Sequence, residues 1–223
     1  MNRSVIAASV MLAGLASSAS ADFVVPDTAT YGWDRGVTAQ STYAEWDVFT
    51  APAGPNAPDV GSYTGGTLPS TAADFNVFDS NESSGSFITS GGNIYSFSGV
   101  VSPQIEFGGF DLGAGQVTTV LLQVRTLGIE IDQSTLLLND SIAPSSTTEL
   151  DRVELGGFGG FQVDTLFEFN LTGNLDAYAI NFDALGTSLS LDRVAVDTFT
   201  FVPTPGTGVL LALGGLVAAR RRR

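Results

Sequence analysis

The sequence predicts an all-β protein. Residues 22–201 are expected to form an antiparallel β-sandwich or jelly-roll-like body, with a signal helix before it and a short hydrophobic helix after it. Apolar and polar residues alternate over short segments of the body, which is the pattern of a half-buried strand. Glycine-rich turns separate these segments at roughly even spacing, and residues 22–201 show no amphipathic helix pattern. Both features are typical of sandwiches and jelly rolls.

The first half of the body gives the weaker strand signals. Residues 22–36 are expected to lead into the body with a short strand, and residues 42–49 form the next strand candidate. Residues 51–70 contain four prolines among Gly, Asn and Ser, which predicts a surface loop. A turn is expected at residues 79–85. The pattern becomes regular from residue 93, where strands are predicted at residues 94–101, 104–110 and 117–127.

The last third of the body alternates most clearly. After a polar loop at residues 140–149, strands are predicted at residues 150–155, 161–171, 178–184 and 189–201. In the last of these the apolar phase slips by one residue near Asp192, which predicts a β-bulge. The glycine-rich run at residues 156–160 lacks both a following helix and a lysine, so a hairpin turn is favoured over a phosphate-binding loop.

The body is strongly acidic. Of the nine basic residues, Arg3 and Arg220–Arg223 lie at the two ends, which leaves four arginines against all 23 acidic residues. The formal charge of the body is therefore −19. Such a surface repels nucleic acids and anionic lipids, so neither is expected as a partner.

The chain contains neither cysteine nor histidine. This composition excludes disulfides, thiolate nucleophiles, Ser-His-Asp triads and zinc sites with histidine or cysteine ligands. Most common enzyme classes are thereby removed, and no residue stands out as catalytic.

Residues 1–21 have the three parts of a secretory signal peptide. Arg3 supplies the positive charge, residues 5–15 the apolar core, and Ala19-Ser20-Ala21 the small-residue cleavage site before Asp22. The predicted route is therefore export from the cytoplasm by the secretion machinery.

The C-terminal segment, residues 202–223, also has the features of a segment that interacts with a membrane. Its apolar run of eleven residues, 209–219, is too short as a helix to cross a hydrocarbon core of about 30 Å without help. Four arginines follow directly, and such a cluster stays on the cytoplasmic side of the membrane and leaves the body outside. The alternative, a buried terminal helix of the body, gives no reason for four consecutive arginines.

This order of proline motif, short apolar helix and arginine cluster resembles the PEP-CTERM sorting signal of exopolysaccharide-producing Gram-negative bacteria. The resemblance implies that a membrane enzyme of the exosortase type recognises the motif and removes the tail, so that the protein reaches the cell surface or extracellular matrix. Thr204 stands where the family's namesake has glutamate. The residues that correspond to the recognition motif are Val202, Pro203, Thr204, Pro205 and Gly206, and those of the cytoplasmic stop are Arg220, Arg221, Arg222 and Arg223.

Three kinds of chemistry remain open for the body. Paired carboxylates could support glycoside hydrolysis, although 23 acids on a small domain make chance proximity common. Oxygen donors in a loop could bind calcium, the one cofactor considered, with structural turn chemistry as the alternative. The carboxylate candidates are Glu45, Asp47, Glu130, Asp132, Glu149, Asp151 and Glu168, and the calcium candidates are Asp79, Asn81 and Glu82, followed by Asn139 and Asp140.

Four aromatic residues near the start of the body are a candidate platform for stacking sugar rings, with burial in the core as the alternative. They are Tyr31, Trp33, Tyr43 and Trp46. The leading hypothesis is a non-enzymatic surface or matrix protein whose partners include exopolysaccharide. A carbohydrate- or calcium-binding module is the second hypothesis, and a polysaccharide hydrolase or lyase that uses carboxylates is the third.

Overall fold

The computed structural model describes residues 23–64, 74–79, 85–110, 112–113, 115–157 and 159–203. The predicted signal helix and C-terminal hydrophobic helix lie outside these residues. Within them the chain forms strands and turns without a helix, and every strand pairing is antiparallel. The prediction of an all-β antiparallel body is confirmed.

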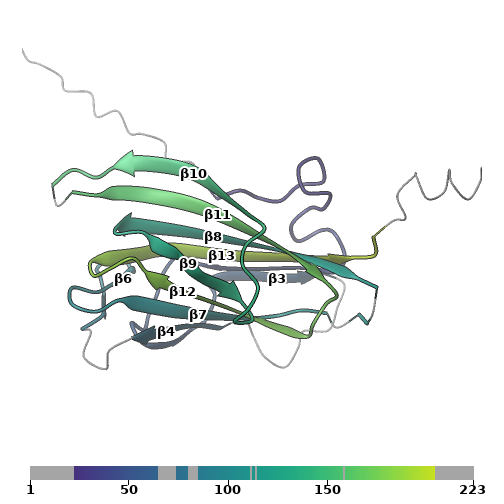
Figure 1. Cartoon of the computed structure of the whole chain (residues 1–223), viewed down its shortest axis with the longest axis horizontal. Coiled ribbons are helices and arrows are strands. Elements are labelled where there is room, and N and C mark those ends of the chain that lie inside the picture. The colour runs from purple at the N-terminus through teal and green to yellow at the C-terminus, as the bar shows by residue number, and fades with distance from the viewer. Residues whose placement is uncertain are drawn as a thin grey trace, which may run out of the picture.

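The strands form two sheets (Figure 1). The eight-stranded sheet has the order β10 (Ser146–Glu154), β11 (Phe161–Thr172), β8 (Val117–Gly128), β13 (Leu189–Phe201), β1 (Ser41–Trp46) and β3 (Val60–Thr64). Its two remaining strands are β6 (Ile94–Tyr95), which pairs with β13, and β5 (Phe87–Ile88), which pairs with β6. The five-stranded sheet has the order β2 (Gly54–Asn56), β4 (Asp74–Asp79), β7 (Val101–Gly108), β12 (Ala177–Ala184) and β9 (Ile131–Leu138).

The chain passes repeatedly from one sheet to the other. Among the strands described, consecutive strands lie in different sheets in every case except β5–β6 and β10–β11. Most strand pairs therefore join segments that are distant in sequence. Such pairing cannot form locally, so neither sheet is expected to assemble before the other.

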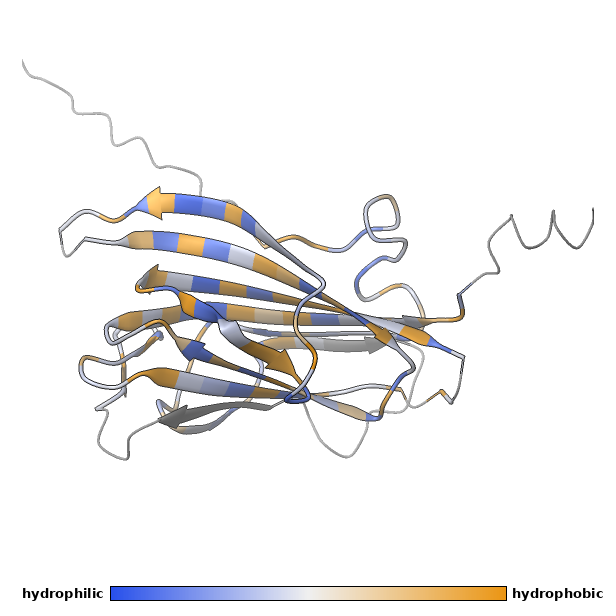
Figure 2. Ribbon diagram, in the orientation of Figure 1, coloured by the Kyte–Doolittle hydropathy of each residue, from blue (hydrophilic) through white to orange (hydrophobic). Residues whose placement is uncertain are grey.

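One hydrophobic core lies between the sheets. The eight-stranded sheet contributes Trp46, Val120, Leu122, Phe167 and Val196, and the five-stranded sheet contributes Ile105, Leu138, Ile180 and Phe182. All nine side chains are less than 3% exposed. Figure 2 shows the alternation of apolar and polar residues along β8, β11 and β13 that this two-layer, sandwich-like packing requires.

The bulge predicted near Asp192 is confirmed. The register of β13 against β8 shifts between Leu191 and Arg193, so Asp192 is the extra residue. The shift keeps Leu191 and Val194 in the same core, although an uninterrupted strand would place them on opposite faces. The hairpin turn predicted at residues 156–160 is also confirmed, because it joins the paired strands β10 and β11.

Several local predictions need correction. The polar loop expected at residues 140–149 is shorter, because β10 begins at Ser146. Residues 94–101 are not one strand. The backbone of Ser96 still bonds to Ser188 and Leu189, but its Oγ accepts a hydrogen bond from the amide of Gly99, and a bend separates β6 from β7. The expected loop at residues 51–70 contains β2 and β3. It is ordered in part by Asn56, whose buried Oδ1 accepts hydrogen bonds from the amides of Thr50 and Ala51. The strand β9 was not anticipated.

The two phenylalanines Phe161 and Phe167 on β11 provide a matched test of the core. Phe167 is 0% exposed and Phe161 is 40% exposed. We expect Phe167→Ala to lower the free energy of unfolding by about 3–5 kcal/mol, because it leaves a cavity between the sheets. Phe161→Ala should cost less than about 1 kcal/mol. Urea denaturation measures both losses, and equal losses would contradict the burial of Phe167 in the core between the sheets.

Candidate functional site

Residues 23–40, called here the N-terminal strap, lie across the outer face of the eight-stranded sheet. The first part of the strap is held by Gln123 of β8, whose side chain is 0% exposed. The amide of Val24 donates to Oε1 of Gln123 at 2.6 Å, and Nε2 of Gln123 donates back to the carbonyl of Val24 at 2.9 Å. The strap contains turns and no strand, so the short strand expected at residues 22–36 is a wrong prediction.

Two bidentate ion pairs lie beneath or beside the strap. Arg35 of the strap donates from Nε and Nη2 to the carboxylate of Asp197 on β13, at 2.6 and 2.5 Å. Arg125 of β8 binds Asp164 of β11 in the same way, at 2.7 and 2.6 Å. Both carboxylates are completely buried. A buried carboxylate is tolerated only when it is paired and hydrogen-bonded, so these two arginines are structural.

The four residues of the predicted sugar platform do not form an exposed surface. Trp33 is 1% exposed and packs on Leu121, Leu166 and Phe199, with its ring stacked 5.5 Å from that of Phe199. Trp46 is 0% exposed and faces the main core, where Nε1 donates to the carbonyl of Asn56. Both tryptophans are therefore buried in the protein, as the alternative interpretation expects. The prediction that they form an exposed sugar platform is wrong.

The two tyrosines of that platform belong to the strap contacts. Tyr31 packs at the edge of the Trp33 cluster, and the guanidinium of Arg35 lies 3.8 Å from the centre of the Tyr43 ring. Both tyrosines are partly exposed. Their ring faces are used by the protein itself, so they do not make a stacking surface with the tryptophans.

Several of the candidate catalytic carboxylates are held in ion pairs. Arg152 binds both Glu130 and Glu149, each at 2.8 Å, and Arg193 binds Glu45. The hydrogen bond from Arg152 lowers the pKa of Glu149, which favours its ionised form. A glycosidase acid needs the opposite shift.

The other carboxylate candidates are mostly used in turns and side-chain pairs. Asp132 accepts hydrogen bonds from the amide and hydroxyl of Ser134, and Glu168 accepts one from the side chain of Asn170. These contacts position backbone and neighbouring side chains. They give the carboxylates a local structural role.

The candidate calcium loop falls largely outside the described residues. Asp79 is the last residue of β4, and Asn81 and Glu82 are not described. At the second candidate, the Oδ1 of Asn139 accepts a hydrogen bond from the amide of Ala179, and Asp140 accepts one from Asn181. Turn chemistry, the favoured alternative, accounts for these two residues. Within the described ranges there is no cluster of three acidic side chains suited to a metal ion.

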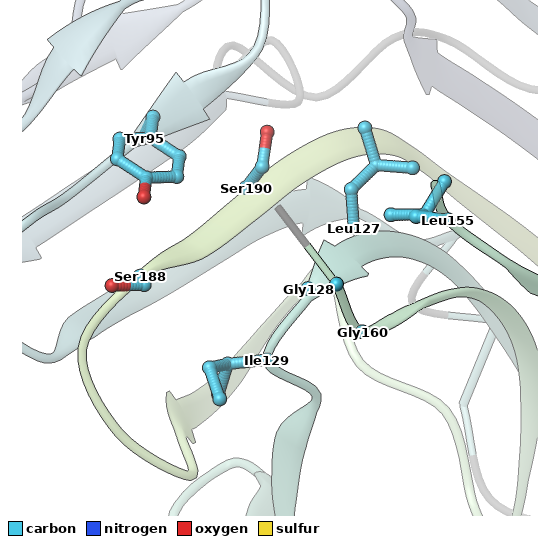
Figure 3. A pocket seen from close by; sticks show the side chains of 9 residues that line it. Tyr95, Leu127, Gly128, Ile129, Leu155, Gly160, Ser188 and Ser190 are labelled. Atoms are coloured by element: carbon cyan, nitrogen blue, oxygen red, sulfur yellow. The ribbon is translucent and has the colours of Figure 1, made fainter. Parts of the chain in front are cut away.

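An open groove of about 350 Å³ lies at one end of the eight-stranded sheet. Its walls come from β6, from the last residues of β8 and the first of β13, and from the β10–β11 turn. Figure 3 shows Tyr95 and Ser188 on one side of the groove, Leu127 and Leu155 on the other, and Ile129 between them. Gly159, Gly160 and Ser190 complete the lining around Gly128.

The floor of the groove depends on glycine at two positions. Gly128 pairs with Phe161 on one side and with Leu189 on the other, so the ends of three strands meet there. A Cβ on Gly160 would lie 2.8 Å from the Cα of Gly128, and Gly160 also has a φ of +86°. Only glycine allows this close approach of two backbones, and the exposed peptide groups become part of the groove surface.

The chemistry of the groove is neutral. Its lining consists of one tyrosine ring, three aliphatic side chains, two serine hydroxyls and glycine backbone, with no carboxylate or guanidinium. Glu130, Glu154 and Asp192 lie within two residues of the lining in sequence, but none of the three lines the groove. Burial raises the pKa of Asp192. Such a surface can bind a neutral ligand with apolar faces and polar edges.

The sequence contained one signal for this groove. The glycine-rich composition of residues 156–160 predicted the hairpin turn correctly, but nothing nearby in sequence indicates that this turn lies beside Gly128 and Ser188. Comparisons with protein-family models, curated proteins and solved structures find no match to the chain. Over the residues described here, no helix reaches the length and apolar character that a bilayer crossing needs.

The buried carboxylate of Asp197 predicts a pH dependence of stability. Burial raises the pKa of Asp197 from 3.8 to about 6, against the opposing effect of Arg35. The folded state thus holds this proton more tightly than the unfolded state. The resulting stabilisation is complete below about pH 4 and is lost as the pH rises through about 6.

We therefore expect Asp197→Asn to flatten the dependence of the free energy of unfolding on pH between about 4 and 6. The wild-type loss assigned to Asp197 over this range is on the order of 3 kcal/mol. Urea denaturation at pH 4, 5, 6 and 7 measures this loss, with Asp176→Asn at an exposed turn as the control. If Asp197→Asn and Asp176→Asn show the same slope as the wild type, Asp197 is not the group responsible.

Proposed function

We propose that this protein is an exported, non-enzymatic component of a bacterial cell surface or extracellular matrix. The signal peptide and the sorting tail of the sequence support export, an encounter with an exosortase-like enzyme and a final location outside the cell. The observation that carries the non-enzymatic part is the neutral lining of the groove, where no carboxylate is found among the described residues. Bond cleavage by carboxylates needs an acid and a base beside the substrate.

We also propose that the body is a jelly-roll-like β-sandwich. The support is the repeated passage of the chain between two sheets that share one core. Jelly rolls are double-sheet structures of this kind, and many serve as binding modules.

The position of the sorting motif fits removal of the tail. Val202 follows the last residue of β13 directly, and it is 64% exposed. Pro203 comes next and is also exposed. Cleavage after this point would remove no strand of the body. An enzyme at the membrane could therefore act on the folded protein.

A carbohydrate-binding module is the second candidate function, and the groove is the observation that favours it. The groove offers an aromatic ring beside hydroxyls, which is the combination that a sugar ring with its apolar face and polar edge can use. A hydrolase or lyase has less support, because Glu45, Glu130 and Glu149 are held by arginines.

The arginine cluster provides the test of sorting. Replacement of Arg220–Arg223 by four glutamines should abolish surface delivery, because the tail loses the charge that stops it on the cytoplasmic side. Replacement by four lysines keeps the charge and should preserve delivery. Surface labelling and intact mass of the recovered protein measure the outcome, and the mass should show loss of both ends.

Equal surface delivery of the glutamine and wild-type proteins would contradict the sorting proposal. The non-enzymatic part is tested separately, by incubation of the recovered protein with neutral and anionic polysaccharides. Release of reducing ends, or of unsaturated products, would overturn it.

A further inference from the structure

We propose that the groove at Tyr95, Gly128 and Ser188, together with the exposed rings of Phe87 and Phe97, binds a neutral polysaccharide chain. This inference rests on the proposed function and specifies its ligand. It also moves the sugar site from the first quarter of the body to the end of the eight-stranded sheet. Four features of the structure support it.

The first feature is an aromatic cluster that continues from the groove to the surface. The ring of Tyr95 lies 4.7 Å from that of Phe97 and 5.6 Å from that of Phe87, measured between ring centres. Phe97 is 67% exposed and Phe87 is 39% exposed. Exposed aromatic rings in contact with one another lose contact with water when an apolar ligand face covers them. A groove with such a lip suits an extended ligand better than a single small molecule.

The second feature is the polar side of the groove. The Oγ of Ser190 accepts a hydrogen bond from Nδ2 of Asn93 at 3.1 Å, which leaves the Ser190 hydroxyl oriented to donate its own proton. Ser188 and Tyr95 add two more hydroxyls to the lining. Hydroxyl groups both donate and accept, so they match the hydroxyls of a sugar without requiring a charged group.

The third feature is electrostatic. Among the described residues that line the groove none is ionised, and the body carries a formal charge of −19. A polyanion would be repelled at long range and would find no cation in the groove. A cationic polymer would be attracted to the acidic surfaces elsewhere on the body and would gain nothing in the groove. The acidic body and the neutral groove together favour a neutral polymer as the ligand.

The fourth feature argues against a peptide as the occupant. An extended peptide commonly binds by adding a strand to an unpaired sheet edge. At the groove, however, β8 is already paired with β11 through Gly128 and with β13 through Leu189. The backbone ladder that a peptide would use is therefore occupied, whereas a sugar needs only the ring faces and hydroxyls.

The groove also lies at the end of β13 opposite to the sorting motif. Ser188 precedes the first residue of β13, and the sorting motif follows its last residue, so the two sites are separated by a strand of 13 residues. At about 3.3 Å per residue this strand spans roughly 40 Å. Figure 1 shows the β12–β13 turn and the last residues of β13 at opposite ends of the eight-stranded sheet. A body attached through its C-terminus would present the groove to the surrounding polymer.

The test uses the protein purified after export and two variants with a matched control. Phe97→Ala removes the most exposed ring of the lip, and Ile129→Trp fills the groove. Leu175→Ala removes another exposed apolar side chain, 46% exposed against 67% for Phe97, between β11 and β12 at the other end of the body. Binding is measured by affinity electrophoresis in dextran, in a soluble cellulose ether, and in alginate as the polyanion. Far-ultraviolet circular dichroism and urea denaturation check that each variant is folded.

We expect at least one neutral polymer to retard the wild type and Leu175→Ala. Alginate should retard both proteins less, or not at all. Phe97→Ala should weaken binding about three- to tenfold, and Ile129→Trp should abolish it. Lack of retardation by every neutral polymer, retardation mainly by alginate, or equal binding by folded Phe97→Ala and wild type would each overturn the inference. A protein that reaches the surface without binding a neutral polymer refutes this inference alone, whereas failed surface delivery or polymer cleavage refutes the proposed function.

Discussion

Burial of β8 and β13 on both faces is the constraint on which the rest of the structure depends. One face of these central strands meets the five-stranded sheet, and the strap covers much of the other. Since the outer face carries Asp164 and Asp197 as well as Leu121, covering it buries two charges. Arg125 and Arg35 neutralise those charges with bidentate geometry, which is the condition under which buried carboxylates are tolerated. Arg152 and Arg193 also bind carboxylates, so all four arginines of the body take part in ion pairs within the protein.

This arrangement has a consequence for function. An arginine that already binds a carboxylate is poorly placed to recognise an anionic ligand, and a carboxylate held by arginine is poorly placed to accept or donate a proton. The hollow that remains at the end of the sheet is lined by neutral side chains and by glycine backbone. Because Gly128 belongs to a central strand paired on both sides, that hollow is formed by the most constrained part of the sheet. Because the arginines and several carboxylates bind one another and the groove is neutral, the structure favours recognition of a neutral polymer by a preformed surface.

The sequence predicted the strands that show a local alternation of apolar and polar residues. It did not predict which residues are buried by contacts with segments distant in the chain. Alternation in residues 161–171 located β11, and the phase slip located the bulge at Asp192, because both are local patterns. The strap could not be located in this way, since its contacts with Gln123 and Asp197 are set by strands about 100 residues or more further along the chain. The consecutive apolar residues 120–122 of β8 were the available signal of burial on both faces. The choice between a platform and core burial stayed open for Trp33 for the same reason, because its partners Leu121, Leu166 and Phe199 come from three other strands.

The measurement that tests the account most directly is an amide NMR titration of the exported protein with a neutral oligosaccharide. The account predicts shift changes at Gly128, Gly160, Ser188 and Ser190 and in residues 95–97, with the strap amides of residues 23–40 unchanged. It also predicts that the oligosaccharide remains intact in the same tube. Shift changes centred on the strap, absence of any change at saturating ligand, or hydrolysis of the oligosaccharide would contradict the account.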